Sequence, residues 1–223
     1  SFEPTLDYVV TKMPRFAFDK FAGASNKLGT QMKATGEVMA VGRTIEESLL
    51  KAVRSLEIGA YHLYLPKFHH MPIDELLDYI KDGTDDRIFA LAQLMWLGVD
   101  YNRLCNITGI DMLFLDKIHN IVELEREIKD APITRENLLR AKRMGFSDRH
   151  LAHLWKCSEQ DVYEKRREFG VFPVYKMIDT CASEFESYVP YFYSTYEEEN
   201  ESVVSDRPKV IVLGAGPIRI GQG

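Results

Sequence analysis

Cysteine is scarce in this sequence, and no thiol is placed to form a metal or redox motif. Cys105, Cys157 and Cys181 lie far apart, and no CxxC pair occurs among the 223 residues. Zinc ribbons and thioredoxin-like sites require such pairs, because two sulfur atoms must reach one ion or each other. We therefore expect reduced thiols in an intracellular protein.

A long apolar run is also missing. No stretch approaches the roughly 18 consecutive apolar residues that a membrane-spanning helix needs. The opening residues, SFEP, have neither the basic start nor the apolar stretch of a secretory signal. Hydrophobic residues make up 45% of the chain and charged residues 28%, as in an ordinary globular protein. These observations predict a soluble, cytoplasmic protein without a membrane partner.

The sequence has no basic excess, since 34 acidic residues against 28 basic ones give a net charge of −6. Nucleic-acid-binding domains usually carry a basic excess on one face, so we expect no nucleic-acid partner. Residues 146–170 nevertheless resemble a helix-turn-helix, with Lys165, Arg166 and Arg167 on its second helix. Glu159 would begin that helix and repel DNA phosphates. We interpret this region as a packing unit and keep a DNA-binding regulator as the alternative.

No Ser-His-Asp, Walker or zinc-hydrolase pattern occurs in the sequence. His62, His69 and His70 come nearest to a metal motif, but they lack the i, i+4 spacing of helical ligands and a neighbouring cysteine pair. Pro66 and Pro72 place two of these histidines in a loop. We therefore expect no metal site.

Helix signals dominate the middle of the sequence, from Thr84 to Gly170. Capping residues followed by apolar residues at helical spacing mark the expected starts, and glycines mark the ends. Thr44 and Glu47 form one such capping box. Helices are expected over 45–56, 72–80, 85–97, 111–129, 135–144 and 159–168, with a short one after Ser147, and strands over 6–12, 38–41 and 209–213. The chain is thus expected to be mainly α, with strands towards both ends.

Two copies of one helical pattern lie 47 residues apart. Gly98 and Gly145 each end a helix, and each is followed by a hydrophobic residue and an N-cap residue, Asp100 or Ser147. The same offset relates three further pairs: Leu104 and Leu151, Ile107 and Leu154, and Asp111 and Ser158. This repeat predicts a duplicated unit of short helix, turn and long helix.

A glycine-rich turn follows the apolar run at 209–213. Gly214, Gly216 and Gly221 would let the backbone approach an anion, and such a turn normally leads into a helix whose N-terminus binds phosphate. Arg219 stands where the dinucleotide fingerprint has its third glycine, although it could itself pair with an anion. An anion site, a plain tight turn and a stand-alone nucleotide-binding enzyme all stay open. We expect the chain to be part of a longer protein.

Four stretches of the sequence resemble the large (synthetase) subunit of carbamoyl-phosphate synthases. They are SFEPTLDYVVTKMPRF (1–16), QMKATGEVMAVGRTIEES (31–48), VYKMIDTCASEFES with YSTYEEENE (174–187 and 193–201), and VIVLGAGPIRIGQG (210–223). They occur in the family's order, and the helical middle agrees in position and pattern.

The resemblance implies a mainly α chain: a helical oligomerisation domain flanked by the α/β tail of one ATP-grasp half and the first strand and glycine loop of the next. Residues 1–56 would be the C-terminal tail of the carboxyphosphate half, 57–204 the oligomerisation domain, and 205–223 the start of the carbamoyl-phosphate half. The parent enzyme would make carbamoyl phosphate from glutamine, bicarbonate and two ATP, for arginine and pyrimidine synthesis.

The resemblance also implies which ligands and partners to expect. The parent would bind ATP with Mg²⁺ or Mn²⁺ outside this segment, so no catalytic residue and no cofactor are expected within it. The parent's partner would be a small glutaminase subunit, and the helical domain would form a homo-oligomer. By their match to the family's stretches, the residues that would line its carbamate tunnel are Met32, Lys33, Glu37, Arg219 and Gly223. Such a closed conduit would protect an unstable anion from water. A purely structural role for Met32 and Glu37 stays open.

Overall fold

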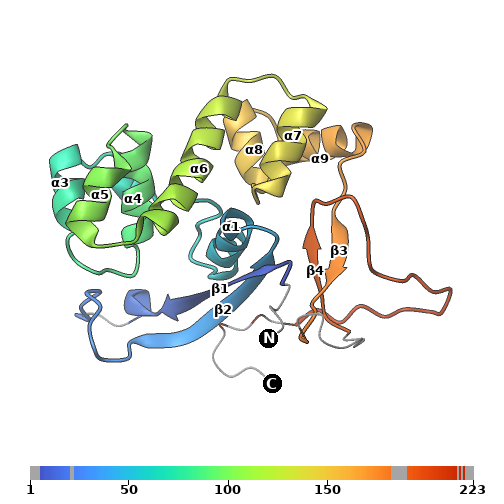
Figure 1. Ribbon diagram of the computed structural model, residues 1–223, viewed down its shortest axis with the longest axis horizontal. Helices are drawn as coiled ribbons and strands as arrows, with labels where there is room; N and C mark the ends of the chain where they lie inside the picture. Colours follow the sequence, from blue (N-terminus) through green and yellow to red (C-terminus); the bar gives the residue numbers. More distant parts are fainter. Residues whose placement is uncertain (1–5, 21–22, 182–189, 215, 217, 219–223) are drawn as a thin grey trace, which may run out of the picture.

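The computed structural model describes residues 6–20, 23–181, 190–214, 216 and 218. This part of the chain is mainly helical, with two small antiparallel hairpins below and beside the helices (Figure 1). The expected mainly α fold is therefore confirmed. Arg219, Gly221 and Gly223 lie outside the described residues. Among the described helices, none is long and apolar enough to cross a membrane.

The first hairpin pairs β1 (Val9–Phe16) with β2 (Ala34–Gly42), and Met13 lies opposite Val38. Helix α1 (Ile45–Ser55) packs on one face of this hairpin, where the side chains of Val38 and Ala40 meet those of Ala52 and Leu56. The strands predicted at 6–12 and 38–41 are thus confirmed, although β1 begins later and both strands are longer. Alternating burial along β2 is typical of a hairpin with one face packed and the other in water.

The remaining helices form one apolar core above the hairpin (Figure 1). They are α2 (Pro66–His69), α3 (Ile73–Tyr79), α4 (Arg87–Trp96), α5 (Tyr101–Thr108), α6 (Met112–Lys129), α7 (Arg135–Arg143), α8 (Asp148–Trp155) and α9 (Glu159–Glu168). Helix α6 crosses the middle and contacts helices on both sides. Leu115, Ile118, Val122 and Leu124, its predicted core residues, are all buried.

The predicted helix caps are mostly confirmed. Asp111, Thr134, Ser147 and Ser158 each accept a hydrogen bond from a backbone amide of the first turn that follows. The predicted cap at Thr84 is wrong, because the Thr84 hydroxyl bonds the carboxylate of Asp86 and the helix begins after that residue.

The 47-residue repeat is visible in the backbone. Gly98 and Gly145 have positive φ values of 84° and 97°. The amide after each glycine bonds the carbonyl five residues earlier, Val99 to Leu94 and Phe146 to Ala141, both at 3.0 Å. The two copies differ in their last helix, since α6 has 18 residues and α9 has 10. The helices predicted at 111–129 and 159–168 are both confirmed, and only the first of them is long.

The second hairpin pairs β3 (Val174–Met177) with β4 (Phe192–Thr195), and Val174 lies opposite Thr195. The sequence pattern predicted no strands there. It predicted a strand at residues 209–213 instead, but Val210–Leu213 form no ladder with the described residues and are 84–89% exposed. An apolar run forms a buried strand only where neighbouring strands satisfy its backbone groups.

Candidate functional site

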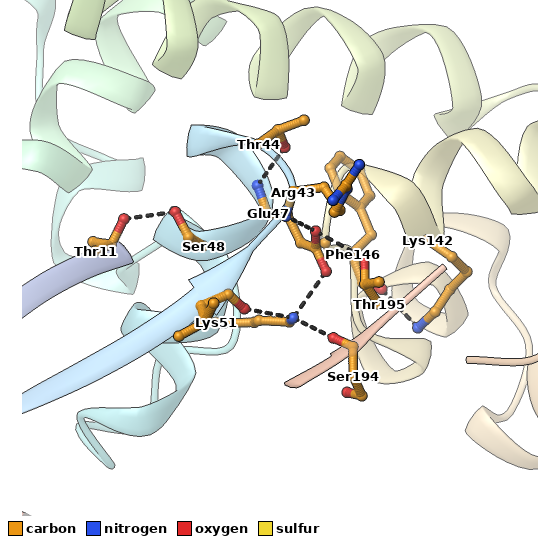
Figure 2. A network of polar contacts seen from close by, with 12 residues as sticks. Thr11, Arg43, Thr44, Glu47, Ser48, Lys51, Lys142, Phe146, Ser194 and Thr195 are labelled. Carbon is orange, nitrogen blue, oxygen red and sulfur yellow. Dashed lines mark hydrogen bonds and ion pairs between the residues drawn. The ribbon is translucent and has the colours of Figure 1, made fainter. Parts of the chain in front are cut away.

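A buried carboxylate lies where the two hairpins meet the helices. Glu47 on α1 is 1% exposed, and its Oε2 accepts hydrogen bonds from the Arg43 amide at 2.8 Å and the Thr195 hydroxyl at 3.1 Å. Its Oε1 lies 2.8 Å from Lys51 Nζ. A buried charge is tolerated only when partners replace its lost hydration, and Glu47 has three. We call Arg43, Glu47, Lys51, Ser194 and Thr195 the Glu47 junction (Figure 2).

Lys51 extends the Glu47 junction to both hairpins. Its ammonium donates to the carbonyl of Val41 on β2 at 2.8 Å and to the carbonyl of Ser194 on β4. Figure 2 shows the dashed lines from Glu47 and Ser194 meeting at the nitrogen of Lys51. The hydroxyl oxygens of Thr11 on β1 and Ser48 on α1 lie 2.6 Å apart. Residues far apart in the sequence are therefore held around one helix.

The second copy of the repeat docks on the same helix. A Cβ atom added to Gly145 would lie 2.9 Å from the Cα of Glu47, so only glycine allows this approach. Arg54 of α1 donates to the Gly145 carbonyl at 2.8 Å. The equivalent Gly98 has nothing within 4 Å of such an atom. The docking is thus specific to the second copy.

A buried lysine lies close to this contact between Gly145 and α1. Lys142 donates to the Phe146 carbonyl and to Asp148 Oδ1, both at 2.8 Å, and Arg166 of α9 lies 2.7 Å from the other oxygen of Asp148. Burial lowers the pKa of Lys142 to about 8, although Asp148 opposes that shift. Burial alone would raise the pKa of the Asp148 carboxyl, but Lys142 and Arg166 bring it below its ordinary value.

The helix-turn-helix interpretation finds no support in the contacts of α9. Arg166 is bound to Asp148, and Lys165 lies 2.7 Å from Glu168. A recognition helix would present such cations to phosphates. Here one of the two cations stabilises the packing of α9 against α8, and the other is neutralised within α9.

The described tunnel residues lie on the hairpin surface. Met32 is 92% exposed, and Lys33 donates to the carbonyls of Ser25 and Lys27 at 3.0 and 2.6 Å. Glu37 forms an exposed ion pair with Lys12 at 2.8 Å. The tunnel role predicted for Met32, Lys33 and Glu37 stays a prediction, as does that of Arg219 and Gly223, which lie outside the described residues.

The glycine turn is only partly described. Gly214 is exposed, and Gly216 has a φ of 89°. A Cβ atom on Gly216 would lie 3.8 Å from Glu57 Oε1, a negative neighbour that does not favour an anion there. Gly221 lies outside the described residues, so the anion site stays a prediction.

Two histidines and a glutamate form a second buried polar cluster, which the sequence analysis missed. The ring of His62 stacks on that of His150 at 3.6 Å, and Glu125 of α6 lies beside both. The residues are 25 to 88 positions apart in the sequence, so no spacing motif could reveal them. His69 lines a cavity beside the cluster, and His70 is exposed.

One family description matches the chain. It is the carbamoyl-phosphate synthetase large chain, oligomerisation domain, and it covers residues 37–170, from β2 to just beyond α9. That range is more than half of the 223 residues. The chain belongs to this family. The matched range includes α1, both copies of the repeat and the His62–Glu125–His150 cluster, so these are features of a large-chain oligomerisation domain. The domain boundaries predicted at residues 57 and 204 stay predictions.

Proposed function

We propose that this chain connects the two catalytic halves of a glutamine-dependent carbamoyl-phosphate synthase large subunit and supplies its self-association surface. The observation that carries the connector role is the Glu47 junction, because it joins the beginning of the described chain to its later part. The hydroxyl of Tyr8 also donates to the Asp179 carbonyl at 3.0 Å, and the rings of Tyr8 and Tyr193 lie 6.3 Å apart. The two segments that lead to the catalytic halves would thus keep a fixed position relative to one another.

The parent enzyme, on this proposal, makes carbamoyl phosphate from bicarbonate, two ATP and glutamine that a small subunit hydrolyses, and it supplies arginine and pyrimidine synthesis in the cytoplasm. ATP with Mg²⁺ or Mn²⁺ would bind to ATP-grasp segments outside this chain. We therefore expect isothermal titration calorimetry with ATP and Mg²⁺ to show no saturable binding. Saturable binding, or ATP hydrolysis by the purified chain, would contradict the assignment of a connector without a complete active site.

The self-association surface is proposed at the junction of α4 and α6. Leu113 and Phe114 in the first turn of α6 are 52% and 55% exposed, and exposed apolar side chains that lie together are typical of interfaces. Phe114 also borders a cavity of about 320 Å³ between β1 and helices α4 and α6. A second copy of the chain would cover these side chains.

Sedimentation velocity over a concentration series tests this surface. We expect the wild-type chain to dimerise or assemble further, and Phe114→Glu to shift it towards monomer. Phe172→Glu is the matched control, because Phe172 is equally exposed at 55% but lies after α9. A wild-type chain that stays monomeric, or a Phe114→Glu variant that assembles like Phe172→Glu, would contradict the proposed surface.

A further inference from the structure

His62, Glu125 and His150 converge from three parts of the helical domain. His62 lies in the loop after α1, Glu125 on α6 and His150 on α8. One side-chain nitrogen or oxygen of each lies within 4.8 Å of the others. The two histidines are only 2% and 4% exposed, so water hydrates them little.

The contacts in this cluster are not those of ordinary hydrogen bonds. His62 Nε2 lies 3.3 Å from Glu125 Oε2, and His150 Nε2 lies 3.4 Å from Glu125 Oε1. Charge-assisted N–H···O bonds are shorter, about 2.7–2.9 Å. Three nitrogen atoms of the cluster have no hydrogen-bond partner among the described residues: both ring nitrogens of His62 and the Nε2 of His150. Buried polar atoms without partners are rare and call for an explanation.

The separations are in the range that a shared metal ion needs, once the stacked rings of His62 and His150 turn so that both Nε2 atoms point at it. Two ligand atoms that each lie about 2.1 Å from a metal and subtend a tetrahedral angle are roughly 3.4 Å apart. The two nitrogen–oxygen separations, 3.3 and 3.4 Å, are close to that value, and each ends on a different oxygen of Glu125. Two imidazoles and one carboxylate are also a recurrent ligand set for divalent transition metals.

His62 and Glu125 are in the forms that bind a metal ion, a neutral imidazole and a carboxylate. Burial, followed by the neighbouring His150, lowers the pKa of His62 to about 4, so this imidazole is neutral at pH 7. Burial would raise the pKa of the Glu125 carboxyl, but contacts with His150 and His62 lower it to about 2.

A cavity leaves room for a further ligand. It measures about 560 Å³ and is bordered by His62, Glu125 and His150 on one side. Tyr61, Tyr64, His69 and His153 are among its other lining residues. Structural metal sites are usually closed by four protein ligands, whereas a three-ligand site keeps one position for water or a small ligand.

We propose that His62, Glu125 and His150 bind one divalent transition-metal ion, such as Zn²⁺, with its fourth position facing this cavity. The ion would join the loop after α1 to α6 and α8, and would fix the second copy of the repeat against the first. No metal site was expected from the sequence, because neither Glu125 nor His150 is near His62 in the chain. This proposal does not rest on the proposed connector function.

Titration of the chelator-treated 223-residue chain with ZnCl₂ tests the proposal. We expect one equivalent to bind and to raise the melting temperature, while MgCl₂ at the same concentration does neither, because imidazole ligands favour zinc over magnesium. Glu125→Gln keeps the side-chain shape and removes the anionic ligand, and His150→Gln removes one imidazole. Each should weaken zinc binding at least about 100-fold.

Two histidines of the same cavity supply the matched controls. His69→Gln and His153→Gln alter cavity-lining residues outside the cluster and should leave the zinc affinity within a few-fold of the wild type. The proposal is overturned if no single saturable equivalent binds to the wild type. It is equally overturned if binding survives Glu125→Gln and His150→Gln but not the two control substitutions.

Cobalt gives a readout that does not depend on variant folding. Co²⁺ added to the wild-type chain should produce the intense visible absorption of a four-coordinate site, and one equivalent of Zn²⁺ should remove it. A spectrum identical to that of Co²⁺ in buffer would refute the geometry inferred from the two nitrogen–oxygen distances. An ordinary charged pair of histidine and glutamate would give that negative result.

Discussion

Each copy of the repeat has a backbone corner, the turn at Gly98 or at Gly145, and the two corners make different contacts. Around Gly98 the corner only ends α4, and a side chain there would meet open space. Around Gly145 the equivalent corner touches α1, and the position of Met95 in the first copy is taken by Lys142 in the second. The two turns therefore share a backbone pattern, and only the turn of the second copy is a docking surface for α1.

The largest expected effect comes from the glycines themselves. Gly98→Ala should cost about 1 kcal/mol, because a residue with a Cβ is strained at positive φ. Gly145→Ala adds a collision with the backbone of Glu47 and should cost roughly 3 kcal/mol in total. Urea unfolding of the two variants measures the difference. Equal losses would mean that the second corner is not a tight docking contact.

Lys142, which stands where the first copy has Met95, makes the free energy of unfolding depend on pH. The folded chain releases the Lys142 proton near pH 8, whereas an unfolded lysine holds its proton to about pH 10.4. Between pH 8 and 10 the unfolded state therefore binds more protons, and stability rises with pH. The free energy of unfolding of the wild type should rise by about 2 kcal/mol relative to Lys142→Met, which installs the first copy's residue. Parallel profiles for the two proteins would exclude this titration.

A smaller effect is expected at the far side of the Glu47 junction. Thr195→Val keeps the side-chain shape but removes the hydroxyl that donates to Glu47, and should cost about 1 kcal/mol. Ser194→Ala is the control, since Ser194 is exposed and contributes its backbone carbonyl to Lys51. Thermal unfolding followed by circular dichroism compares the two. A larger loss for Ser194→Ala would show that the buried hydroxyl is not the important contact.

The smallest effect concerns the ends of α5 and α8. Gly109 and Lys156 occupy equivalent positions, and both are left-handed, with φ of 70° and 54°. Lysine is strained there and glycine is not. Lys156→Gly should therefore stabilise the chain by up to about 1 kcal/mol, and Gly109→Ala should destabilise it by about as much. Destabilisation by Lys156→Gly in urea unfolding would indicate a lost side-chain contact.

Features that depend on neighbouring residues were predicted from the sequence. The caps at Asp111, Thr134 and Ser158 follow from hydrogen bonds that span a few residues, and the repeat follows from glycines at a fixed offset. Thr84 was misassigned because Asp86, two residues later, takes its hydroxyl. The helix therefore begins after Asp86 and not after Thr84.

The buried polar sites could not be predicted in the same way. Glu47 was recognised as a capping residue, but nothing near it in the sequence indicated that Thr195 would become its partner. His62 was considered together with His69 and His70, but its partners lie on two later helices. Such sites depend on tertiary packing, which brings distant elements together and cannot be inferred from local periodicity.

The Lys51 ammonium has three N–H bonds, and each has its own oxygen acceptor: Val41 on β2, Glu47 on α1 and Ser194 on β4. None remains for water. The angles between those bonds are fixed by the sp³ nitrogen, so they constrain how the two hairpins are inclined to one another across α1. Arginine, with its flat guanidinium, has donors in one plane and could not reach all three acceptors. One nitrogen atom thus sets an angle between segments that are more than 140 residues apart.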